Sequence, residues 1–110
     1  MPTVFKHAVN TAIGTVPIDV LQIPGGVRAT VIGLNLSNTT NYDNVVVDIK
    51  VVDESSTEGF YVKGLVIPPG SSVKVVTQGE KLILPESAGL RINSDTDSSV
   101  DSTISYVEIS

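Results

Sequence analysis

Residues that branch at Cβ make up more than a third of this chain, and that proportion limits its fold more than any other feature. Of the 110 residues, 18 are Val, 10 are Ile and 10 are Thr, whereas only 4 are Ala. Such side chains lose rotamer freedom in a helix and pack well on a pleated sheet. The composition therefore predicts an all-β fold. The length fits one domain that buries its own core, so we expect a single domain over residues 1–110.

Turn signals rich in Gly, Pro, Asn, Asp and Ser recur about every ten residues and separate runs of strand length. The runs predict nine strands, at 3–9, 15–22, 27–37, 45–53, 60–67, 72–77, 81–84, 89–94 and 100–109. Short strands at this spacing are typical of an antiparallel β-sandwich, and we expect one of 8–9 strands that is Ig-like or jelly-roll-like. Residues 1–14 have the weakest pattern, so we expect them to form an N-terminal arm.

Hydrophobic alternation assigns faces to the predicted strands. In residues 45–51 every odd position is apolar, and Asp48 and Lys50 stand between them, which is typical of a half-buried strand. The run from Val27 changes parity near Ile32. Either a β-bulge or a strand that crosses from one sheet to the other would explain the change.

Several apolar residues fall on faces that the alternation assigns to solvent. They are Val46, Val52, Tyr61, Leu65, Val76, Val107 and Ile109. Either a neighbouring subunit covers them, or the assumed register is displaced by one residue in these strands.

The charge balance disfavours polyanionic partners. Seven Lys and Arg residues against twelve Asp and Glu residues give a net charge of −5, and no two of the cations are adjacent. Binding to nucleic acid or to anionic lipid needs clustered cations, so we expect neither nucleic acid nor a membrane as partner. The segment Met1–His7 lacks the apolar run of a signal peptide, and no apolar stretch has the length of a membrane span, so we expect synthesis in a cytoplasm.

The residue inventory leaves few means of catalysis. The chain has no Cys, a single histidine (His7) and no G-x-S-x-G motif around a serine nucleophile. The acidic group of Asp53, Glu54 and Glu58 lacks the surrounding aromatic residues of a glycosidase cleft, which favours a solvated loop. We therefore expect no enzyme, no catalytic residue and no cofactor.

Two further motifs allow a binding function. Asp95, Asp97 and Asp101 have the early spacing of a calcium loop, but Val100 occupies the position of its glycine and Tyr106 that of its final glutamate. We expect a polar loop without a metal ion. A module that binds host-surface carbohydrate would need an aromatic surface, for which Tyr42 and Tyr61 are the available rings.

Five short segments resemble sequences of one group of proteins. They are ATVIGLNLSN at 29–38, YVKG at 61–64, IPPGSS at 67–72, KLIL at 81–84 and ISYVEI at 104–109. Together they resemble the small β-sandwich virion proteins of tailed bacteriophages, over roughly residues 27–110. The resemblance implies a structural protein without catalytic residues, located on the virion. A capsid decoration (cement) protein is the first expectation; a neck, collar or tail accessory protein is the alternative.

A decoration protein acts through contacts with copies of itself and with other virion proteins such as the major capsid protein. Strand addition between subunits supplies main-chain hydrogen bonds for such contacts. We expect the interface at the N-terminal arm and the last strand, with the side chains of Val4, Phe5, His7, Ile104, Tyr106, Val107 and Ile109.

Overall fold

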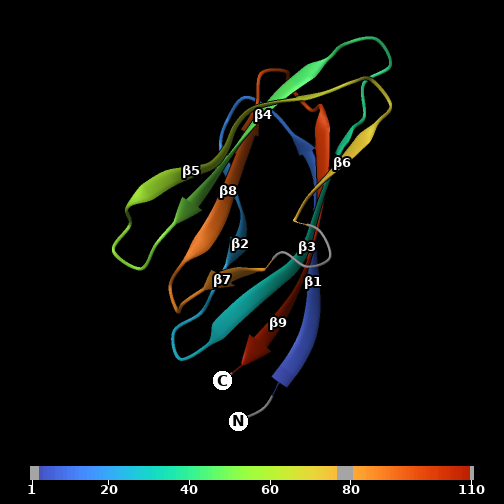
Figure 1. Cartoon of the computed structure of the whole chain (residues 1–110). Helices are drawn as coiled ribbons and strands as arrows, with labels where there is room; N and C mark the ends of the chain where they lie inside the picture. Colours follow the sequence, from blue (N-terminus) through green and yellow to red (C-terminus); the bar gives the residue numbers. More distant parts are fainter. Residues whose placement is uncertain (1–2, 77–80, 110) are drawn as a thin grey trace.

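The computed structural model describes residues 3–76 and 81–109, and within them it contains nine strands (Figure 1). These are β1 (Thr3–Ile13), β2 (Ile18–Gln22), β3 (Arg28–Asn38), β4 (Val45–Val52), β5 (Glu58–Ile67), β6 (Ser72–Val76), β7 (Leu82–Leu84), β8 (Gly89–Ser94) and β9 (Val100–Ile109). The nine predicted strands and the all-β class are confirmed, although β2 begins after Pro17 and not at residue 15. A search of the described residues for a helix long and apolar enough to cross a membrane finds none.

The strands form two antiparallel sheets. Sheet A has the order β1-β9-β3-β6, with β7 also paired to β3, and sheet B has the order β2-β8-β4-β5. The pairs β1–β9, β2–β8, β3–β6 and β4–β5 are nested one inside the next along the chain, as in a long hairpin that is rolled up. This order is that of a jelly roll, so the topology decides between the two expected sandwich types.

The strands β6 and β7 lie along the same edge of β3. Residues 34–37 of β3 pair with β6, and residues 29–31 pair with β7. The two strands thus occupy one sheet position in two pieces. The turn predicted at Gln78-Gly79-Glu80, and the last residue of the strand predicted at 72–77, lie outside the described residues.

The core lies between the inner faces of the two sheets. The odd residues Val45, Val47 and Ile49 of β4 are fully buried, as the alternation predicts, and they face a layer from sheet A that includes Leu36 and Ile104. Burial of one such side chain stabilises the fold by about 1.5–3 kcal/mol relative to exposure. The hydrophobic effect acting on these two faces therefore holds the sheets together.

A β-bulge explains the change of parity in β3. Val31 pairs with Tyr106 and Gly33 pairs with Ser105, so Ile32 is an extra residue without a partner on β9. Its side chain is 41% exposed, whereas Val31 and Leu34 on either side of the bulge are buried. The bulge interpretation is confirmed, because β3 stays in sheet A along its whole length.

The apolar residues assigned to solvent divide into two groups. Val76 is only 2% exposed, so its assignment to an outer face was wrong; the register of β6 shifts beside it, where it pairs with Leu34. Leu65 likewise lies opposite the buried Val47 and packs against the core. Val46, Val107 and Ile109 are half-buried on outer faces.

The close approach of β8 and β2 gives a stability prediction. A Cβ atom built on Gly89 would collide with the carbonyl oxygen of Leu21, which belongs to the backbone and has no room to move away. We expect Gly89→Ala to lower the free energy of unfolding by about 1–3 kcal/mol in urea denaturation, as overpacking does. Gly59→Ala is the matched control, since no atom lies within 4 Å of its Cβ position. Equal losses in the two variants would contradict this account.

Candidate functional site

The three aspartates with calcium-like spacing serve separate structural contacts. The Asp101 carboxylate accepts a hydrogen bond from the backbone N–H of Ala12 (3.0 Å), and that of Asp97 accepts one from the Thr15 hydroxyl (3.1 Å). Asp95 accepts one from the backbone of β4. In residues 3–76 and 81–109, no three acidic or histidine side chains are grouped so that they could hold a metal ion.

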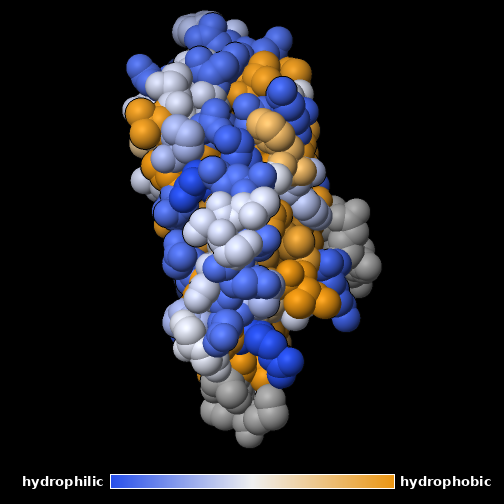
Figure 2. Space-filling view, turned by 90° about the vertical axis from the view of Figure 1, so that its left-hand side faces the viewer, coloured by the Kyte–Doolittle hydropathy of each residue, from blue (hydrophilic) through white to orange (hydrophobic). Residues whose placement is uncertain are grey.

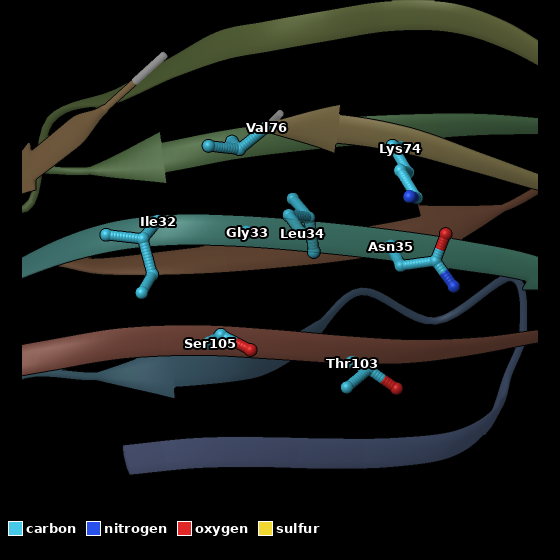
Figure 3. A pocket seen from close by; sticks show the side chains of 8 residues that line it. All are labelled: Ile32, Gly33, Leu34, Asn35, Lys74, Val76, Thr103 and Ser105. Carbon is cyan, nitrogen blue, oxygen red and sulfur yellow. The ribbon is translucent and has the colours of Figure 1, made fainter. Parts of the chain in front are cut away.

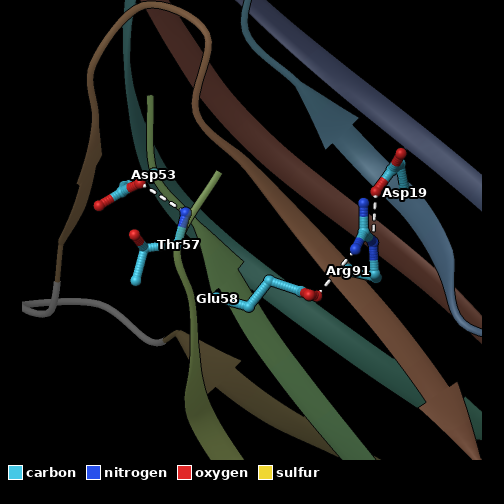
Figure 4. Close-up of polar contacts among 5 residues, drawn as sticks. All are labelled: Asp19, Asp53, Thr57, Glu58 and Arg91. Carbon is cyan, nitrogen blue, oxygen red and sulfur yellow. Dashed lines mark hydrogen bonds and ion pairs between the residues drawn. The ribbon is translucent and has the colours of Figure 1, made fainter. Parts of the chain in front are cut away.

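The acidic loop after β4 is organised around one carboxylate. Oδ1 of Asp53 accepts hydrogen bonds from the Ser55 hydroxyl (2.8 Å) and from the backbone N–H groups of Ser55 and Thr57 (2.9 Å each). These donors stabilise the charged form, with the Ser55 hydroxyl contributing most, and hold the pKa of Asp53 below its usual value. Figure 4 shows the contact with Thr57. The carboxylate thus closes a turn.

The outer face of sheet B has ion pairs between its own residues beside a few apolar side chains such as Val66, which is 52% exposed. The guanidinium of Arg91 on β8 contacts Asp19 of β2 through Nε and Glu58 of β5 through Nη1, both at 2.8 Å (Figure 4). The hydrogen bond to Asp19 is the main reason that the pKa of Arg91 lies above its usual value. The ammonium nitrogens of Lys50 and Lys63 lie 5.1 and 5.0 Å from the ring centre of Phe60. Figure 2 shows this side of the molecule mostly in hydrophilic and neutral colours.

The Asp53 turn gives a pH prediction. A folded-state pKa below the unfolded value means that the stabilisation is complete above the unfolded pKa and is lost as the pH falls through the folded one. We expect Asp53→Asn to lower the urea midpoint at pH 7, and the difference from wild type to disappear well below about pH 4, where the unfolded carboxyl is protonated. A difference that stays constant down to pH 2–3 would show that charge plays no part.

The outer face of sheet A has a different character. We define the outer A face by its outward-pointing residues, which are Thr3, Phe5, His7 and Val9 of β1, Asp101, Thr103, Ser105, Val107 and Ile109 of β9, Arg28, Thr30, Ile32, Gly33, Asn35 and Ser37 of β3, Ser72 and Lys74 of β6, and Ile83 of β7. Phe5, Val107, Thr30 and Ile83 form one row across four strands, with Phe5 78% and Ile83 71% exposed.

Charge on the outer A face is also unlike that of the whole chain. The residues that define it include two cations, Arg28 and Lys74, and one carboxylate, that of Asp101, although the chain has twelve acidic residues and a net charge of −5. A face that combines exposed apolar side chains with two cations fits an apolar or acidic protein surface better than it fits water.

A shallow depression of about 240 Å³ lies in the outer A face, where β3 meets β6 and β9 (Figure 3). Its floor includes Gly33, which has no side chain and follows the bulge at Ile32. Asn35 lines it too, and Oδ1 of Asn35 is buried with no hydrogen-bond partner among the described residues. A buried acceptor without a partner is uncommon in a folded protein, and its desolvation costs free energy that no hydrogen bond offsets here.

The structure separates the residues that the sequence suggested for an interface. Val4, Phe5 and His7 are exposed on β1, and Val107 and Ile109 are half-buried on β9. Ile104 is fully buried and Tyr106 nearly so, because the even positions of β9 face sheet B. The side chains of these two residues belong to the core and are not available on the surface.

Sequence reasoning did not find Ile32, Ile83 or Asn35. Ile83 stands between two leucines in a strand of three residues, where alternation gives little signal. Ile32 is displaced by a bulge whose exact position the pattern left open. Of the two tyrosines suggested for carbohydrate, Tyr42 is 90% exposed in the loop after β3, whereas Tyr61 is half-buried and packs against the core.

Neither protein-family models nor curated protein sequences match the chain. Chains in three solved structures share its fold. A chain of Bacillus endospore appendages, described as disulfide-linked pili, is 12% identical, with a TM-score of 0.58 over 98% of this chain and 88% of that one. A chain of T=1 particles derived from infectious bursal virus is 13% identical, with a TM-score of 0.56 over 97% of this chain and 30% of that one.

The third is a chain of the cyanophage Pam1 capsid asymmetric unit, which is 19% identical, with a TM-score of 0.53 over 96% of this chain and 84% of that one. These likenesses establish the fold. The chain is a jelly roll similar in structure to capsid and pilus subunits. It differs from disulfide-linked subunits in one chemical respect, since it has no Cys with which to form such links.

Proposed function

We propose that this chain is a non-enzymatic structural protein of a tailed-phage virion, and specifically a decoration protein that stabilises the capsid shell from its surface. The observation that carries the proposal is the outer A face, which combines exposed Phe5, Ile32 and Ile83 with a depression and has one carboxylate against two cations. The resemblance in five sequence segments selects the virion as the setting, and a neck, collar or tail accessory position would use the same face.

The outer faces of the two sheets suit different surroundings in such a protein. On sheet B, Arg91 is matched by Asp19 and Glu58 of the same chain, which suits that part of the face to solvent. On the outer A face, the apolar row and the depression are left for another molecule. We infer that the partners are the major capsid protein and other copies of this chain. Many such contacts repeated by shell symmetry add up to firm attachment even when each is weak.

Replacement of one exposed apolar residue by serine on each face tests which face of the molecule binds the shell. Ile83→Ser removes an apolar side chain from the outer A face, and Val66→Ser removes one from the outer side of sheet B, where it lies opposite Val46. The probe is a shell assembled from the major capsid protein of the virion to which the proposal assigns this chain. In cosedimentation, we expect Ile83→Ser to weaken binding by about tenfold, as loss of an interface anchor does, and Val66→Ser to bind as wild type. Equal effects, or no binding by the wild type, would remove the proposal.

Asn35 allows stability and binding to be separated. Asn35→Val replaces a buried acceptor that has no partner with an apolar side chain suited to a strand, so we expect the free energy of unfolding to rise by about 1 kcal/mol. The same change replaces a polar side chain that lines the depression with an apolar one, so we expect weaker binding to the shell. Asn93→Val on sheet B is the matched control and should leave shell binding unchanged. A more stable Asn35→Val protein with undiminished binding would show that the depression is not part of the contact.

A further inference from the structure

Four strand positions form the edges of the two sheets: β1 and β6–β7 in sheet A, and β2 and β5 in sheet B. An edge strand presents unpaired backbone N–H and C=O groups, which another extended strand can bind if the edge is long and regular. The four edges differ greatly in this respect.

Three of the edges are interrupted within the described residues. β2 has five residues and a register shift between Asp19 and Leu21. The edge formed by β6 and β7 is split into two short strands. β5 is longer, but it has register shifts against β4 and a glycine, Gly64, in the left-handed region at φ 72°. Irregular edges of this kind are poor templates for a further strand.

β1 is the exception. Its residues from Thr3 to Asn10 pair with β9 from Ile109 to Ser102 without a register shift, and the first shift comes only after Asn10. The strand has neither Gly nor Pro between Thr3 and Ile13. Figure 1 shows it at one border of sheet A. Within residues 3–76 and 81–109, β1 is therefore the edge strand that is both long and regular.

The charged side chains of β1 do not prevent its pairing with another strand. Natural edge strands often carry a free lysine that disfavours pairing. In β1 the ammonium of Lys6 is bound to the carboxylate of Glu108 at 2.8 Å, and this contact raises the pKa of Lys6. No residue of Thr3–Ile13 is acidic. Two copies of a chain with net charge −5 repel each other overall, but along β1 they do not bring carboxylates together.

We propose that β1 pairs antiparallel with β1 of a second copy, so that two sheets A join into one continuous sheet across a two-fold axis. A head-to-tail arrangement would need a second regular edge on the same chain, whereas a two-fold contact uses the same edge twice and closes. The inference deepens the proposed function by naming the contact between copies.

Side-chain chemistry indicates the register of this pairing. With the axis at His7, Phe5 of each copy lies opposite Val9 of the other, which forms two aromatic–aliphatic cross-strand pairs on the outer A face. An axis one residue earlier would place the two Lys6 side chains opposite each other, which is unfavourable. The axis at His7 also extends the apolar part of the outer A face from one copy to the other.

The absence of Cys makes a cross-linking test direct. Residues directly opposite in an antiparallel pair have Cα atoms about 4.5–5.5 Å apart, within the range of a disulfide. We expect wild-type protein in sedimentation equilibrium to show twice the 11.6 kDa mass of the chain. We expect oxidised His7→Cys to form a covalent dimer at least about tenfold faster than Thr103→Cys. Thr103 is an exposed control on the same face, but it lies on β9 between two strands and cannot reach a second copy through an edge.

Three results would overturn the inference. They are a wild type that remains monomeric up to millimolar concentration, equal cross-linking rates for His7→Cys and Thr103→Cys, and faster cross-linking through Lys63→Cys on the β5 edge. Circular dichroism confirms that each variant is folded before its rate is compared. Shell cosedimentation is a separate measurement. A monomer that binds shells refutes the β1 pairing alone, whereas a β1-linked dimer that ignores shells refutes only the proposed function.

Discussion

Burial of two apolar sheet faces against each other is the constraint on which the rest of this structure depends. Each sheet is one layer thick and has few means of stabilising itself, so every strand has to present apolar residues inward. Val47 and Ile49 on one side and Leu36 and Ile104 on the other meet this requirement with complete burial. The core does not constrain the side chains of the outer faces, and these side chains differ between the two sheets.

The candidate site arises where the regular pleat is broken. The extra residue Ile32 displaces β3 against β9, and a second register shift at Leu34 and Asn35 displaces it against β6. Together with Gly33 these irregularities hollow the sheet surface and leave the Asn35 carbonyl buried without a partner (Figure 3). Sheet B also has register shifts, but on its outer face Arg91 forms ion pairs with Asp19 and Glu58 across three strands.

Structural features that depend on the pattern within one segment could be predicted from the sequence. Features that depend on pairing between distant strands could not. β-Branched composition, turn spacing and the alternation of residues 45–51 are properties of single segments, and they predicted nine strands and a sandwich correctly. Strand order is a property of distant segments, so the jelly roll stayed one of two alternatives. The same reason explains Ile104 and Tyr106. Their strand was predicted, but which parity of β9 faces inward depends on where sheet B lies.

The pairing of Thr3 with Ile109 has a consequence for how the chain reaches its native state. β1 precedes its neighbour β9 by most of the 110 residues, so sheet A cannot be completed until β9 has been synthesised. Bringing β1 and β9 together closes a loop of nearly the whole chain. The chain loses conformational entropy in this step before contacts between the two strands stabilise it, and folds dominated by such distant pairings form slowly. Until β9 has been synthesised, β1 therefore lacks a paired strand on both sides, and it is then open to pairing with a strand of another molecule.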